Sequence, residues 1–192
     1  MNGALRAELL RMRQQEDDLH TELSQSGEIY GGYHPRLETL NAAQGNRLDE
    51  IMAEFGWPGR SLVGDDGAHA AWFAAIHAIS LPDVQRRALP LLQDAVARDD
   101  ADPVMAAMLE DKIAFMERRP QRYGSQFDWA ESGQLEPWTI DDPEHVDERR
   151  AAAGMEPLAR RIEMFRDSPG RPADLGAYYK RFEEWRRSVG WP

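Results

Sequence analysis

The stretch HAAWFAAIHAIS, residues 69–80, constrains the fold of this chain more than its other segments. It is apolar on nearly every side of a helix, and such a helix is buried by neighbours on several faces. The stretch nevertheless contains His69 and His77, two of the five histidines of the chain. An ionisable ring at His77, inside a segment suited to a protein interior, raises the question of what the ring faces.

Apolar residues that recur at steps of three and four residues predict further helices before and after this one. They are expected over residues 3–24, 35–55, 82–97, 103–118 and 141–154. Between the last two, apolar and polar residues alternate about a glycine-containing turn, which predicts a short β-hairpin at residues 125–140. The expected fold class is therefore mainly α, with six or seven helices packed as a single globular domain and one hairpin.

The composition changes after residue 166, and this change predicts the domain organisation. Residues 1–166 form the expected helical domain, residues 167–174 are rich in proline and glycine and read as a linker, and residues 175–192 form an amphipathic C-terminal helix. We expect the aromatic stripe of this helix to pack on the body of the chain or to form a homodimer contact. The alternative is a free arm that binds a partner.

Charge and composition exclude several classes of function. The chain has 34 acidic and 23 basic residues, a net charge of −11, which opposes binding to nucleic acid backbones. It has no cysteine, which excludes disulfides, thiolate zinc sites and cysteine nucleophiles. No run approaches the roughly 18 apolar residues of a membrane span, and the N-terminus does not resemble a targeting segment. We expect a cytoplasmic protein with neither a nucleic acid nor a membrane as partner.

Three polar residues occupy positions where the helical pattern asks for Leu or Ile. They are Glu16, Gln44 and His77. A buried carboxylate is costly unless it is paired, and an imidazole is a natural partner for it. Such a pair is also suited to general acid and base catalysis near neutral pH. The sequence predicts that Glu16 and His77 lie within the reach of a hydrogen bond or of one bridging water, in a functional pocket or in a closed core that they satisfy.

Metal binding receives little support from the spacing of the histidines. His69 and His77 are separated by about 12 Å along a helix, too far to chelate one ion. His34 and Glu38, spaced i, i+4, could face one cation together, but no third ligand is evident. Motifs such as HExxH, a phosphate-binding glycine loop or GxSxG are absent. We expect no metal and no cofactor.

The segment RYGSQFDW, residues 122–129, combines hydrogen-bonding and aromatic residues beside the predicted hairpin turn. Tyr123 and Gln126 could bind a ligand there, and an ordinary structural anchor for the hairpin is an equal alternative.

Three separated segments, EFGWPGRSLVGDDGAHAAWFAAIHAIS, RPQRYGSQFDW and IDDPEHVDERRAAAGMEPL, together resemble a bacterial family known as domain of unknown function 6624. The resemblance covers about residues 5–166, and the family has no established activity. It implies an acid near Glu16, an amide near Gln44 and a YGTQ-like motif at residues 123–126. Members often have Asp and Asn at the first two positions, Gln in place of Ile76 and His in place of Asn41, so the implied pocket is reshaped here.

The function expected from these observations is a pocket for a small polar molecule. His77 would transfer protons and Glu16 would orient it or act as its acid partner. The residues expected to bind the substrate are Gln44, Tyr123, Gln126, His34 and Asn41. The alternative is a non-catalytic helical module that binds a ligand or a protein.

Overall fold

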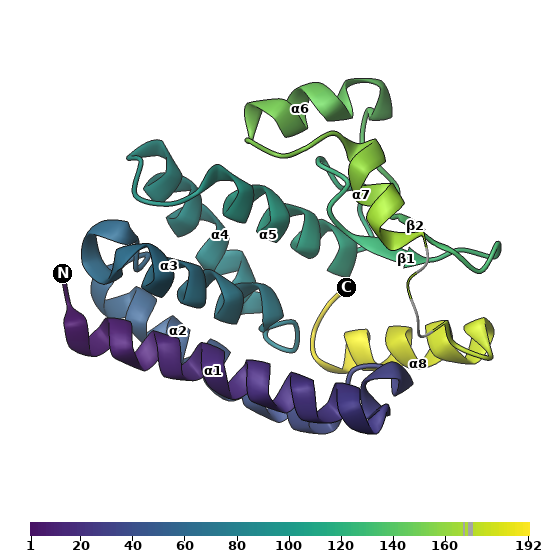
Figure 1. Cartoon of the computed structure of the whole chain (residues 1–192), viewed down its shortest axis with the longest axis horizontal. Helices are drawn as coiled ribbons and strands as arrows, with labels where there is room; N and C mark the ends of the chain where they lie inside the picture. Colours follow the sequence, from purple (N-terminus) through teal and green to yellow (C-terminus); the bar gives the residue numbers. More distant parts are fainter. Residues whose placement is uncertain (167, 169–170) are drawn as a thin grey trace. The chain divides into compact units, whose positions relative to one another are not determined.

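The computed structural model describes residues 1–166, 168 and 171–192. Within this described part the chain forms eight α-helices, two short 3-10 helices and one antiparallel β-hairpin, so the mainly α fold is confirmed (Figure 1). Six or seven helices were expected, and the additional one is α7 (Leu158–Phe165), which has only about two turns. No helix in the described part is both long and apolar enough to cross a membrane.

Two compact units make up the chain, residues 1–105 and residues 106–192. The boundary falls inside helix α5 (Pro103–Met116). The predicted division into residues 1–166, a linker and a C-terminal helix stays a prediction, and residues 167, 169 and 170 of that linker lie outside the described part of the chain.

The first unit is built around α3 (Arg60–His77), the helix that contains most of the apolar stretch. It packs against α1 (Gly3–Ser26), α2 (Pro35–Phe55) and α4 (Pro82–Ala97) (Figure 1). Its buried residues lie on several sides and are mostly small: Val63, Gly67, Ala68, Ala70, Ala71, Ala74, Ala75 and Ile76. Small side chains let the neighbouring helices approach closely, which explains why this segment is rich in alanine.

The C-terminal end of α3, where His77 lies, is held by two neighbouring helices. Gln85 of α4 is fully buried and donates to the carbonyl oxygens of Ala75 and Ile76, at 2.9 and 3.1 Å. These hydrogen bonds satisfy carbonyl groups that the end of a helix leaves without partners. Gly45 of α2 lies so close to the following turn that a Cβ atom there would come within 2.8 Å of the Ala78 Cβ. The position of His77 is therefore fixed by packing on both sides.

The second unit contains the hairpin of β1 (Phe127–Trp129) and β2 (Leu135–Pro137), inside the predicted range. Its register pairs Phe127 with Pro137, Asp128 with Glu136 and Trp129 with Leu135. One face of the hairpin meets α7, where the rings of Phe127 and Phe165 are 4.6 Å apart. The 3-10 helix η2 (Pro143–His145), α6 (Val146–Ala152) and α8 (Leu175–Ser188) complete the unit, and a short 3-10 helix η1 (Glu28–Gly31) belongs to the first.

Candidate functional site

The predicted pair of Glu16 and His77 forms between α1 and α3. The Nδ1 atom of His77 lies 2.6 Å from the Oε1 atom of Glu16, which confirms the expected proximity. The Glu16 side chain is 6% exposed, whereas that of His77 is 36% exposed. The atoms are close without the alignment of a hydrogen bond, because Nδ1 has no hydrogen-bond partner among the described residues. A buried carboxylate thus faces an imidazole whose ring reaches solvent.

Aromatic and cationic groups fix the orientation of the imidazole. The ring of Phe73, one turn earlier on α3, meets the His77 ring edge to face with centroids 4.1 Å apart. The guanidinium of Arg13 lies over the same Phe73 ring, 3.2 Å from its centroid. Asp17 accepts a hydrogen bond from Arg13 Nε at 2.7 Å. The ring of Phe73 therefore contacts both the Arg13 guanidinium and the imidazole, and both contacts suit the quadrupole of an aromatic ring.

The two predicted amides of α2 also point into the interior of the first unit. Gln44 Nε2 donates to the Met12 carbonyl oxygen at 2.7 Å, one helical turn before Glu16 on α1. Asn41 Nδ2 donates to the Tyr33 hydroxyl at 3.1 Å. Burial, together with the charges of Glu38 and Glu16, raises the pKa of Tyr33 far above its ordinary value, although the bond from Asn41 opposes the shift. Tyr33 is therefore a neutral hydroxyl, and it accepts the hydrogen bond from Asn41.

Several buried polar atoms in this cluster have no hydrogen-bond partner within the described part of the chain. They are the Oε2 atom of Glu16, the Oδ1 atom of Asn41 and the Nδ1 atom of His77. Glu16 and Asn41 are each only 4% exposed. Nearly all buried polar groups in proteins are hydrogen-bonded, and exceptions often mark a functional site or a bound water or ion.

His34 has local partners. Its Nδ1 atom accepts from the backbone N–H of Arg36 at 3.2 Å, which caps α2, and its Nε2 atom lies 3.3 Å from Glu28. Across residues 1–166, 168 and 171–192, no group of three or more His, Asp or Glu side chains is arranged to hold a metal ion.

Tyr123 and Gln126 belong to the second unit, whereas Glu16, His34, Asn41, Gln44 and His77 belong to the first. The loop around them is braced by its neighbours. Gln121 Oε1 accepts from the backbone N–H of Gln126 at 2.8 Å, and Gln126 Nε2 donates to the Ser125 hydroxyl at 3.0 Å. The structure thus places Glu16 beside His77. His34, Asn41 and Gln44 belong to the same unit, and Tyr123 and Gln126 belong to the other.

Asp111 of α5 is a buried residue that the sequence reasoning missed. It is fully buried, and its carboxylate accepts backbone hydrogen bonds from Arg122, Tyr123 and Ser125 at 2.8 to 3.2 Å. Burial raises the pKa of Asp111 above its ordinary value, and the backbone hydrogen bonds act in the opposite direction. The pattern that identified Glu16, an acid inside an apolar helix, also marks Asp111. This residue lies in the apolar segment MAAMLEDKIAFM, residues 105–116.

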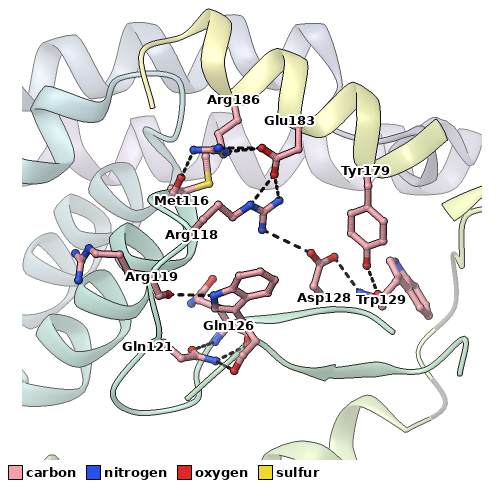
Figure 2. A network of polar contacts seen from close by, with 11 residues as sticks. Met116, Arg118, Arg119, Gln121, Gln126, Asp128, Trp129, Tyr179, Glu183 and Arg186 are labelled. Atoms are coloured by element: carbon pink, nitrogen blue, oxygen red, sulfur yellow. Dashed lines mark hydrogen bonds and ion pairs between the residues drawn. The ribbon is translucent and has the colours of Figure 1, made fainter. Parts of the chain in front are cut away.

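A second group that the sequence reasoning missed lies between the hairpin and α8. Figure 2 shows the side chains of Arg118, Asp128, Tyr179 and Glu183 pointing toward one another. Glu183 accepts from Arg118 Nε at 2.6 Å, and Asp128 lies 4.0 Å from Arg118 Nη1. These residues are up to 65 positions apart in the chain, and no local pattern relates them.

A sequence model of a family of unknown function, DUF6624, matches residues 4–172. The chain belongs to this family. The match includes every residue of the His77 cluster and the hairpin, and it ends before α8 begins at Leu175. Comparison with curated proteins and with solved structures finds no match. Because the function of the DUF6624 family is unknown, membership in it indicates no activity for this chain.

Proposed function

We propose that the first unit of this DUF6624 protein binds a small polar molecule and that His77 transfers a proton to or from it. The observations that carry the proposal are the buried polar atoms without hydrogen-bond partners at Glu16 and Asn41 and the close contact between Glu16 and His77. Each such atom costs on the order of 1–3 kcal/mol when no ligand or water pairs with it. Proteins tolerate this cost at sites whose function requires it.

The two catalytic groups have different roles in this proposal. The carboxylate of Glu16 lies 2.6 Å from Nδ1 of His77, and a lone pair on that nitrogen would be repelled at such a distance. Glu16 therefore favours the form of the imidazole that carries its proton on Nδ1, which leaves Nε2 as the proton acceptor. This is how a carboxylate orients a catalytic histidine in other enzymes. Asn41 and Gln44, whose amides point into the same unit, would orient the substrate.

The other predicted substrate-binding residues, His34, Tyr123 and Gln126, stay predictions. The competing function is a helical module that binds a ligand or a protein without catalysis. The unsatisfied atoms favour a ligand in either case, and the close pairing of an imidazole with a carboxylate favours proton transfer.

We further propose that the protein is cytoplasmic, which agrees with a chain that has no cysteine. We also propose that it has no nucleic acid partner, because its net charge is −11. A homodimer contact through α8 stays a prediction. The mass of the protein in solution, measured by light scattering, tests it.

Replacing His77 with Leu tests the site through stability and binding together. We expect the free energy of unfolding to be unchanged or to rise, because residues kept for function are often not those that maximise stability. We also expect loss of fragment binding. Thermal melts and ligand-observed NMR with a library of small polar fragments measure the two effects.

The matched control for this experiment is His69→Leu. His69 lies on the same helix, is exposed, and contacts the ring of Trp72. Fragments that bind the wild type should still bind this variant. If His77→Leu lowered the free energy of unfolding by several kcal/mol and bound the same fragments as the wild type, His77 would be an ordinary core residue and the proposal would fail.

A further inference from the structure

Three buried polar atoms on α1 and α2 have no hydrogen-bond partner among the described residues. They are Nη1 of Arg13, Oε2 of Glu16 and Oδ1 of Asn41. The first is a donor and the other two are acceptors. Glu16 and Asn41 are each only 4% exposed, and buried polar groups nearly always have a partner. A ligand that satisfies this cluster must therefore complement two acceptors and one donor.

The two acceptors lie at about the same level of the α1–α2 pair. Gln44 of α2 donates to the Met12 carbonyl oxygen of α1, and the two helices run in opposite directions (Figure 1). Glu16 lies roughly 6 Å beyond Met12 along α1, and Asn41 lies roughly 4.5 Å from Gln44 in the same direction. Burial raises the pKa of Tyr33, and the charge of Glu16 adds to this shift. Because Tyr33 also accepts the bond from Asn41, the Glu16 carboxylate lies on the side of α1 that faces Asn41.

The free donor borders the same cluster. Arg13 lies three residues before Glu16, on the same side of α1. Its Nε atom donates to Asp17 at 2.7 Å, and its guanidinium covers the Phe73 ring that contacts His77. Within the described part of the chain Arg13 and Glu16 form no ion pair, so the free donor and the free acceptor stay apart. The side chains of Arg13 and His77 are 29% and 36% exposed, and solvent reaches the cluster from their side.

The kinds of atom left free select among the chemical classes of ligand. A carboxylate offers only acceptors, and Glu16 would repel it. An amidinium or ammonium ion offers only donors, so Nη1 of Arg13 would stay unpaired beside a second positive charge. A carboxamide is neutral and offers two N–H donors and one carbonyl acceptor in a single plane. It alone of these classes matches both the number and the kind of the free atoms.

We propose that the first unit binds a small primary amide, and this proposal rests on the function proposed for the same site. The NH₂ group of the ligand donates to Glu16 and Asn41, and its carbonyl oxygen accepts from Arg13. Gln44 is already bonded to the Met12 carbonyl and holds α2 against α1, so it positions Asn41.

Titration of the full-length protein with acetamide, sodium acetate and acetamidinium chloride, followed by ¹H–¹⁵N NMR, tests this proposal. The three probes share their size and planar shape and differ in donors, acceptors and charge. At equal ionic strength, we expect acetamide to cause saturable shifts at the amides of residues 13–16, 41–44 and 73–77. Its dissociation constant should lie near the millimolar range, and acetate and acetamidinium should bind about tenfold more weakly or not at all.

Replacing Arg13 with Met tests the role of the free donor. Acetamide then loses the partner of its carbonyl, and acetamidinium no longer meets a neighbouring cation. The preference for acetamide over acetamidinium should therefore disappear. Met is unbranched and can keep the contact with Phe73. Arg11→Met, at an exposed position of the same helix, removes the same charge and should keep the preference of the wild type.

Replacing Asn41 with Leu tests one of the two acceptors. We expect about tenfold weaker binding of acetamide, because one N–H group of the ligand loses its acceptor. Asn46→Leu, at an exposed position of α2, should bind acetamide as the wild type does. An unchanged amide spectrum in the second unit shows that each variant is folded.

The proposal fails if acetate or acetamidinium binds as tightly as acetamide, or if Arg13→Met and Arg11→Met show the same preference. It also fails if acetamide causes no saturable shifts, which would mean that only ordered water pairs with the free atoms. The fragment library tests the proposed function separately. Fragments without a carboxamide that bind the wild type but not His77→Leu would support the proton-transfer site and overturn the ligand class.

Discussion

Replacing Asp111 with Ala should lower the free energy of unfolding by about 4 kcal/mol, because a fully buried carboxylate is removed and three backbone N–H groups lose their acceptor at once. These are the N–H groups of Arg122, Tyr123 and Ser125, all within 3.2 Å of the Asp111 carboxylate. Chemical denaturation measures the loss. Hydrogen exchange should show faster exchange at the same three amides, because the loop that they belong to loses its attachment to α5.

Two further variants make this expectation specific. Asp111→Asn keeps one oxygen acceptor and should lose less stability than Asp111→Ala. Asp94→Ala, at an exposed position of α4, should stay within about 0.5 kcal/mol of the wild type. An Asp111→Ala protein as stable as Asp94→Ala would show that the loop is held in another way.

Replacing Arg186 with Ala should lower the free energy of unfolding by about 3 kcal/mol, because its guanidinium fixes α8 to the rest of the second unit. The Arg186 side chain is 3% exposed, donates to the Met116 carbonyl oxygen at 2.9 Å and pairs with Glu183 at 2.8 Å (Figure 2). Its removal leaves a buried carbonyl without a donor and a partly buried carboxylate with one cation fewer. Thermal and chemical denaturation measure the change.

The neighbouring arginine provides a matched control. The Arg187 side chain is 69% exposed and lies 3.8 Å from the same carboxylate. Its replacement with Ala should change the free energy of unfolding by less than about 0.5 kcal/mol, as is usual for an exposed ion pair. Equal effects of the two substitutions would mean that α8 does not depend on the buried guanidinium.

Helical periodicity predicted most of the fold because it reports on burial directly. Most of the apolar stretch at residues 69–80 belongs to a helix that packs on three others, and the alternating pattern at residues 125–140 contains both strands. The short helix α7 lacked such a signal, because two turns contain too few apolar positions to define a period.

The candidate site was predictable only where a polar residue interrupts an apolar stripe. Glu16, Gln44 and His77 stand out in this way, and the structure places Glu16 beside His77. The sequence pattern does not single out Arg118, Asp128 or Tyr179. They lie in segments that are polar or irregular, where one more polar residue does not stand out. They meet only through the packing of α8 on the hairpin, which depends on contacts between distant parts of the chain.

The protonation state of the His77 ring tests the proposed function most directly. Long-range ¹H–¹⁵N NMR of protein labelled at histidine distinguishes a ring nitrogen that bears a proton from one that does not. With the imidazole neutral, we expect the His77 proton on Nδ1, facing Glu16, and a lone pair on Nε2. In Glu16→Gln this preference should be lost, while His69 should be unchanged. A wild-type His77 with its proton on Nε2, or with the same preference in Glu16→Gln, would contradict the proposal that Glu16 prepares His77 for proton transfer.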